Sequence, residues 1–172
     1  MAPISVVIPT RGRPDLIGRS VRAVLANRGV DFDVTVIDQS DDDGTAKVVN
    51  ALAAEDARLR YVHTTPPGLS RAYNLGVRLT NAPIIAFTDD DCVAAQDWVA
   101  SIASAFASQP DADLLYGRVA LPAELEGSTG HVPVLPILRA ERLDGRNGFR
   151  IYGMGANFAS RRRLIERIGG FD

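Results

Sequence analysis

The chain has 172 residues, of which 46% are hydrophobic, and its formal net charge is −2. This length suits one domain with a real core, and the near-neutral charge gives no electrostatic argument for binding nucleic acid or an anionic membrane surface. Cys92 is the single cysteine, which excludes an internal disulfide and favours a reducing compartment. The N-terminus has no basic segment before its apolar run, so we expect no signal peptide. No run approaches the ~20 apolar residues that span a bilayer. We expect a cytoplasmic location, with peripheral attachment to the inner face of a membrane as the open alternative.

Short β-rich runs alternate with helical patterns along most of the chain. Strands are expected at 4–8, 34–37, 60–63, 84–87 and 114–116. Apolar residues with a helical period predict helices around 16–25, 48–53, 75–79 and 98–106. This alternation predicts an α/β fold with a mainly parallel central sheet and helices on both faces. The continuous apolar runs of the strands are typical of strands that are buried on both sides.

The pattern fails between 122 and 152, a segment rich in glycine, proline and charge. So long a stretch without regular structure is uncommon in a compact domain, and is usually a functional or a disordered loop. After it, 155–160 is a candidate strand and 161–170 predicts a helix with a glycine stop. We therefore expect a single domain over 1–172 with one long irregular loop.

Polar residues follow three of the expected strands. The first strand ends at Pro9, Thr10 and Arg11, the second at Asp38, and the fourth at the acidic residues 89–91. If the sheet is parallel, these tips meet at one edge, where open α/β sheets bind their ligands. A carboxylate at the tip of the second strand commonly accepts hydrogen bonds from a ribose or a base.

The three adjacent carboxylates Asp89, Asp90 and Asp91 repel one another, so folding alone gives little reason for them. Mg²⁺ and Mn²⁺ prefer oxygen ligands, and Mg²⁺ usually binds through one or two carboxylates plus substrate phosphates. On a strand, Asp89 and Asp91 would face the same side and could share an ion, while Asp90 turns away. The alternative interpretation is a solvated strand end or an N-cap for the next helix.

Other polar features have structural interpretations. The segment 41–44 (Asp-Asp-Asp-Gly) predicts a turn and a helix cap, and the three arginines at 161–163 predict a solvated helix start. His63 and His131 lack metal-ligand spacing, and nothing marks Cys92 as a nucleophile, so we assign no role to these three residues.

Four segments carry a family resemblance: VVIPTRGRPD, VTVIDQSDDDGT, GLSRAYNLGVRLTNAPIIAFTDDDCVAAQDWV and GANFASRRRLIERIGGFD. In this order and spacing they resemble the inverting nucleotide-sugar glycosyltransferases of family 2. The match runs from about Ile4 to Asp172, with 122–152 unmatched. The resemblance implies a GT-A fold, a Rossmann-like sandwich. It also implies transfer of a sugar from a nucleoside diphosphate to an acceptor hydroxyl, with inversion and with Mn²⁺ or Mg²⁺ as cofactor.

The resemblance also implies roles for single residues. Asp38 would face the base, Arg71 would reach the diphosphate, and Asp89 would lie near the ribose. The metal ligands would be Asp91 and Asp89, and Asp90 remains a candidate because some family members place the metal on the middle position. The donor-binding residues that the resemblance implies are Pro9, Thr10, Arg11, Asp38, Arg71, Asn74, Asp89 and Asp90.

Two departures from the family pattern matter. The position before the asparagine, often arginine in the family, is Tyr73, and the arginine is Arg71. The sequence stops at Asp172, before the segment that carries the family's catalytic base. We therefore expect donor and metal binding but little or no transfer by this polypeptide. A base within it would be sought at Glu141 or Asp144. The expected partners are a UDP-sugar and a carbohydrate or lipid-linked acceptor, and not nucleic acid.

Three alternatives remain open. A non-catalytic nucleotide-sugar-binding module fits the lack of a recognisable base. A nucleotidyltransferase would need a glycine-rich phosphate loop after the first strand, which PTRGRPD matches poorly. A Rossmann dehydrogenase would need G-x-G-x-x-G there, and the sequence has none.

Overall fold

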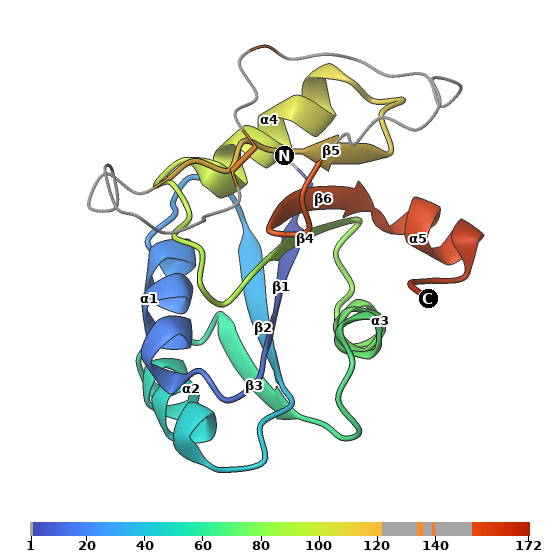
Figure 1. Ribbon diagram of the computed structural model, residues 1–172. Coiled ribbons are helices and arrows are strands. Elements are labelled where there is room, and N and C mark those ends of the chain that lie inside the picture. Colours follow the sequence, from blue (N-terminus) through green and yellow to red (C-terminus); the bar gives the residue numbers. More distant parts are fainter. Residues whose placement is uncertain (1, 122–133, 136–138, 140–152) are drawn as a thin grey trace.

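The computed structural model of this protein describes residues 2–121, 134–135, 139 and 153–172 (Figure 1). Most of the predicted loop at 122–152 therefore lies outside the described residues, as do His131, Glu141 and Asp144. No helix in the described ranges is long and apolar enough to cross a membrane. In chain order the elements are β1 (Ile4–Thr10), α1 (Pro14–Leu25), β2 (Phe32–Asp38), α2 (Gly44–Glu55), β3 (Leu59–His63), α3 (Leu69–Leu79), β4 (Ile84–Thr88), α4 (Trp98–Ser108), β5 (Leu114–Tyr116), β6 (Asn157–Arg161) and α5 (Arg162–Ile168).

The strands form one sheet in the order β3-β2-β1-β4-β6-β5. β1 pairs in parallel with both β2 and β4, and β2 pairs in parallel with β3. β6 runs antiparallel to its neighbours β4 and β5, a direction that the sequence pattern did not specify. All residues of β1 and β4 are buried, as the continuous apolar runs predicted. The predicted α/β fold with a mainly parallel sheet is confirmed.

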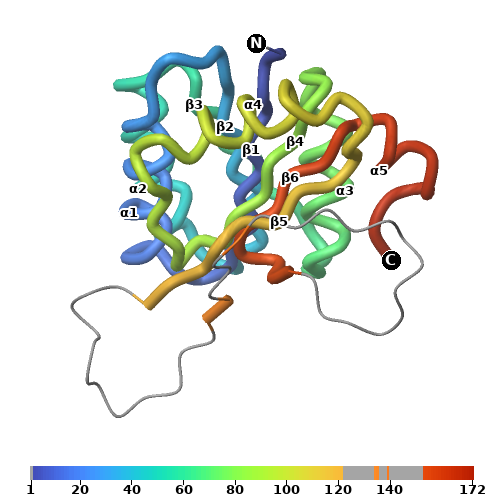
Figure 2. The backbone as a smooth tube through the Cα atoms, turned by 90° about the horizontal axis from the view of Figure 1, so that it is seen from above, coloured from blue at the N-terminus to red at the C-terminus, as the bar shows by residue number. Residues whose placement is uncertain are grey.

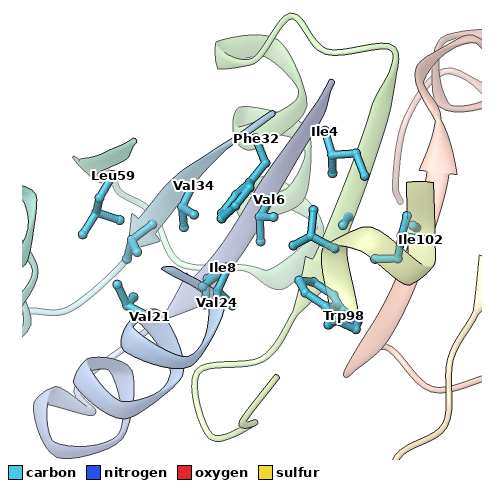
Figure 3. Close-up of a cluster of buried hydrophobic side chains, with 14 of the residues drawn as sticks. Ile4, Val6, Ile8, Val21, Val24, Phe32, Val34, Leu59, Trp98 and Ile102 are labelled. Carbon is cyan, nitrogen blue, oxygen red and sulfur yellow. The ribbon is translucent and has the colours of Figure 1, made fainter. Parts of the chain in front are cut away.

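Helices cover both faces of this sheet (Figures 1 and 2). On one face, α1, α2 and α4 pack against alternate residues of the central strands. Figure 3 shows the side chains at the centre of this layer: Ile4, Val6, Ile8, Val21, Val24, Phe32, Val34, Leu59, Trp98 and Ile102. Burial of each large aliphatic or aromatic side chain contributes ~1.5–3 kcal/mol, so this layer is the main source of stability.

The other face carries α3 and α5. A Cβ atom at Gly76 of α3 would lie 2.4 Å from Cγ1 of Val7, so only glycine lets α3 approach β1 this closely. Beyond this contact, the rings of Tyr73, Phe87 and Phe158 pack together, with centroids 4.5 to 5.8 Å apart. The α3 side of the sheet is therefore closely packed under the strand tips.

The arginines at the start of α5 correct a prediction. Arg162 donates hydrogen bonds of 2.8 to 2.9 Å to three carbonyl oxygens between 77 and 82, at the end of α3 and the turn after it. Arg161 donates to the carbonyls of Phe106 and Ala112. Only Arg163 is exposed. The prediction of a solvated helix start was therefore wrong for Arg161 and Arg162. The last carbonyls of a helix need hydrogen-bond donors, and the guanidinium fork of an arginine supplies several donors at once.

We predict that Arg162→Ala lowers the free energy of unfolding by about 2–4 kcal/mol, because hydrogen bonds from a charged donor contribute more than neutral ones. The matched control is Arg163→Ala, which removes an exposed ion pair with Asp113. That change should lower the free energy of unfolding by less than about 1 kcal/mol. Denaturant unfolding measures both values. Equal losses would contradict the buried role of Arg162.

Candidate functional site

The site lies where the strand order of the sheet changes direction. β1 has β2 on one side and β4 on the other, and such a switch point opens a crevice at the carboxyl ends of the strands. Thr10 at the end of β1 pairs in register with Asp38 at the end of β2. β4 runs parallel to β1 and ends at Thr88, directly before the acidic residues. The predicted convergence of the polar strand tips at one edge is confirmed.

Asp90 is the buried member of the acidic triplet, with 5% of its surface exposed. Its Oδ2 accepts a 2.7 Å hydrogen bond from the hydroxyl of Thr10, and its Oδ1 accepts one of 3.0 Å from Nη1 of Arg13. The prediction that Asp90 turns away from Asp91 was wrong, because Nη1 of Arg13 lies 3.0 Å from Asp90 and 3.4 Å from Asp91. β4 ends at Thr88, so the strand alternation does not extend to these residues. The solvated interpretation fails for Asp90, and the N-cap position of α4 is Asp97 instead.

The other two carboxylates are more open. The side chain of Asp91 is 50% exposed and lies 3.4 Å from Nη1 of Arg13. No described side chain donates a hydrogen bond to the carboxylate of Asp89, whose backbone carbonyl is held by Ser20 of α1. Burial, followed by the charges of Asp91 and Asp90, raises the pKa of Asp89 above its usual value.

Arg13 is a residue that the sequence prediction missed. It occupies the N-cap position of α1, and the charge of Asp90 is the main reason that its pKa is raised. One nitrogen of its guanidinium contacts the carboxylates of both Asp90 and Asp91. The positive charge of Arg13 therefore lies beside the acidic triplet. The two arginines in PTRGRPD were the available signal, because parallel pairing places this segment beside the end of β4.

Asp38 is completely buried at the tip of β2. Its carboxylate accepts hydrogen bonds from the backbone N–H of Ser40 at 2.9 Å, from the Ser40 hydroxyl, and from the Tyr61 hydroxyl at 2.8 Å. The Ser40 hydroxyl accepts a hydrogen bond from the N–H of Gly12, which ties this tip to the β1–α1 connection. Burial and the Asp38 carboxylate raise the pKa of Tyr61 to about 12. Asp38 thus positions the loops around it, and its contact with a base stays a prediction.

The remaining residues near this edge are mostly structural. Pro9 is buried. Arg11 forms an exposed ion pair of 3.0 Å with Asp41. Asp42 accepts a hydrogen bond from the N–H of Gly44, which confirms the predicted turn, whereas the N-cap residue of α2, Asp43, forms no side-chain capping bond.

A hollow of about 490 Å³ lies beside the tip of β2. It is lined in part by Tyr61 and His63, but by none of the residues 89–91. His63 Nε2 lies 2.9 Å from the carbonyl oxygen of Ser40. Burial raises the pKa of Cys92 to about 11, so its thiol stays protonated at neutral pH. Neither His63 nor Cys92 gains a chemical role from this geometry.

Asn74 of α3 holds the end of the chain. Its amide donates a 2.8 Å hydrogen bond to the carbonyl of Phe171 and accepts one of 2.9 Å from the Phe171 N–H. Both ends of the amide are engaged, so a direct contact of Asn74 with a donor stays a prediction. Arg71, one turn earlier, is exposed and has no ion-pair partner among the described residues.

Tyr73 of α3 is buried in the core on the α3 face of the sheet. Its ring contacts the rings of Phe87 and Phe171, at 4.9 and 5.1 Å between centroids. Its hydroxyl is buried and has no hydrogen-bond partner among the described residues. Burial and then the charge of Asp89 raise the pKa of Tyr73 above its usual range.

Asp89 and Asp91 are the residues of the triplet that could hold a divalent cation. The described ranges contain no preformed group of three or more acidic, histidine or cysteine side chains arranged around a metal position. Mg²⁺ does not need such a cage, because it usually binds through one or two carboxylates plus phosphate oxygens. The carboxylate of Asp89 has no side-chain donor, and that of Asp91 is half exposed, so both retain oxygen lone pairs for an ion.

We predict opposite effects for two tyrosine-to-phenylalanine changes. Tyr61→Phe removes a donor to the buried Asp38 and should lower the free energy of unfolding by ~1–2 kcal/mol. Tyr73→Phe removes a hydroxyl that has no hydrogen-bond partner in the described part of the chain, so stability should stay unchanged or rise by up to ~1 kcal/mol. Thermal and urea unfolding of both variants test this pair. A loss in Tyr73→Phe equal to that in Tyr61→Phe would show that the hydroxyl is hydrogen-bonded.

Several known proteins are similar to this chain in sequence or in fold. The chain is 33% identical over 118 residues to validoxylamine A glucosyltransferase of Streptomyces hygroscopicus subsp. jinggangensis, covering 66% of this chain and 28% of the relative. A mannosyltransferase of Pyrobaculum calidifontis, in complex with GDP-Man and Mn²⁺, has a similar structure, with a TM-score of 0.74 at 23% identity over 98% of this chain and 47% of that one. S. aureus TarS 1-349, in complex with UDP-GlcNAc, gives a TM-score of 0.77 at 18% identity over 96% and 47% of the two chains.

These proteins are longer than this chain, which spans less than half of each. The structural likeness confirms the GT-A fold that the resemblance implied. The sequence model described as glycosyl transferase family 2 matches residues 5–169, nearly the whole chain. This protein therefore belongs to glycosyl transferase family 2.

Proposed function

We propose that this domain binds a nucleoside diphosphate sugar with Mn²⁺ or Mg²⁺ and serves its transfer to an acceptor hydroxyl with inversion. The observation that carries the proposal is the position of the acidic triplet at the switch point between β1 and β4. Asp90 is bonded to Thr10 across this edge, which leaves the carboxylates of Asp89 and Asp91 for a ligand. Support comes from the two structural neighbours, which hold GDP-Man with Mn²⁺ and UDP-GlcNAc.

In this proposal Asp91 and Asp89 hold the cation, and the chain around them binds the nucleotide. A divalent cation there supplies positive charge that offsets the charge developing on the departing diphosphate. Arg71 is exposed on α3 and is free to reach the diphosphate. The tips of β1 and β2, with Pro9, Thr10, Arg11 and Asp38, would border the nucleoside, and uridine is the favoured base.

In the proposed transfer, the acceptor and the leaving group lie on opposite faces of the sugar, so the configuration at the anomeric carbon inverts. The acceptor oxygen forms a bond to the anomeric carbon from the face opposite the donor phosphate, while the carbon–oxygen bond to that phosphate breaks and the diphosphate keeps the electron pair. A carboxylate base takes the hydroxyl proton, which typically contributes 10²–10⁴-fold. We assign this base to a segment beyond Asp172. We propose a hexose as the sugar and a carbohydrate or lipid-linked molecule as the acceptor.

We predict that UDP binds this protein only with Mn²⁺ present, and that Asp91→Ala weakens this binding by about tenfold or more, because the cation loses a ligand. Isothermal titration of UDP, with Mn²⁺ and then with a chelator, measures the effect. Asp91 is half exposed, so the variant should fold. The matched control is Asp43→Ala, which removes an exposed carboxylate at the N-cap of α2 and should leave UDP affinity unchanged.

Other outcomes are equally informative. Metal-independent UDP binding, or identical affinities for Asp91→Ala and wild type, would overturn the metal assignment. Binding of GDP but not UDP would change the base and leave the site in place. Transfer at a normal rate by this polypeptide would contradict the assignment of the base to a segment beyond Asp172 and would exclude the non-catalytic nucleotide-sugar-binding module.

A further inference from the structure

Arg13 is a fixed positive charge inside the site proposed for the cation. Its Nη1 lies 3.0 Å from Oδ1 of Asp90 and 3.4 Å from Oδ2 of Asp91. Its side chain is 52% exposed, and among the described residues no acceptor of a hydrogen bond or ion pair lies at Nε or Nη2. The guanidinium is therefore attached at one nitrogen and open at the others.

The two contacts of Arg13 differ in strength. The side chain of Asp90 is only 7% exposed, and its second oxygen is bound to the hydroxyl of Thr10. The side chain of Asp91 is 50% exposed, and its contact is the longer one. A charge pair with a buried, hydrogen-bonded partner is screened less by solvent than an exposed pair. Arg13 is therefore held mainly by Asp90, and an ion that takes Asp91 would leave it in place.

This arrangement has opposite consequences for two ligands. A divalent cation that binds alone competes with Nη1 for the charge of Asp91 and lies next to a positive guanidinium, which repels it. A nucleoside diphosphate brings several negative charges between the two cations. The open nitrogens of Arg13 suit phosphate oxygens, because the guanidinium fork binds phosphate with two parallel hydrogen bonds.

We propose that Arg13, anchored by Asp90 and Thr10, couples the two ligands: it weakens binding of the cation alone and strengthens binding of the cation together with a nucleoside diphosphate. Asp90 is then a positioning residue for Arg13. This inference rests on the proposed function. It also explains why the middle carboxylate is buried: an exposed Asp90 would not hold Arg13 once Asp91 is taken by an ion.

The test uses Arg13→Gln with two readouts that do not depend on catalysis. Free Mn²⁺, counted by electron paramagnetic resonance, gives the affinity for Mn²⁺ alone, and calorimetry gives the affinity for UDP at saturating Mn²⁺. We expect Mn²⁺ alone to bind about fivefold tighter to the variant, and UDP with Mn²⁺ to bind about fivefold weaker. The factor by which UDP raises Mn²⁺ affinity should fall accordingly, because coupling between two ligands is reciprocal.

Three further variants sharpen the test. Arg13→Lys keeps the charge and should resemble wild type for Mn²⁺ alone, while UDP binding weakens because the fork is lost. Arg78→Gln, an exposed change on α3, removes one positive charge away from the triplet and should change neither affinity. If Arg13→Gln leaves the buried Asp90 unpaired and unfolds, the double variant with Asp90→Asn removes that buried charge and should show the same two shifts.

The outcomes separate this inference from the proposed function. Two affinities that move in the same direction, or that stay unchanged, in folded Arg13→Gln would overturn the coupling while wild-type binding of Mn²⁺ and UDP upholds the proposed function. Absence of both Mn²⁺ and UDP binding by folded wild-type protein would overturn the proposed function and this inference with it.

Discussion

The contact on which this site depends is the buried carboxylate of Asp90, which accepts hydrogen bonds from Thr10 and Arg13. It joins the end of β4 to the end of β1 and to the start of α1, across the point where the strand order changes direction. A buried charge is tolerated only when it is paired and hydrogen-bonded, so the acidic turn cannot move independently of the β1–α1 connection. The mutual repulsion of three carboxylates is offset, before any ligand binds, by a cation from the chain itself.

A second connection links the α3 face to the end of the chain. Asn74 holds the backbone of Phe171, and the Phe171 ring packs against Tyr73 and Phe87. In Figure 1 the C-terminus accordingly lies beside α3. A Cβ atom on Gly170 would lie 2.6 Å from Oδ1 of Asn74, so the glycine before Phe171 lets the amide reach this backbone. Two segments that resemble the family separately, GLSRAYNLG and GGFD, are therefore one structural unit.

Much of this arrangement could be predicted from local sequence patterns. Strand tips at Thr10, Asp38 and Thr88 follow from short apolar runs that end in polar residues, and a parallel sheet must bring such tips to one edge. The orientation of the three carboxylates within the acidic triplet could not be predicted in this way. Period-two alternation holds only within a strand, and β4 ends one residue before the acids, so the rule placed Asp90 on the wrong side.

The sequence by itself determined the order and type of the elements, the α/β class, the acidic edge and the family, because each depends on periodicity or on short motifs in a fixed order. Only the tertiary structure decided which polar groups meet. Arg13 and Asp90 are 77 positions apart, Asn74 and Phe171 are 97, and Arg162 and Thr80 are 82. Such contacts depend on strand order, on the direction of β6 and on which carbonyls a helix end leaves unpaired, and none of these is encoded in a local pattern.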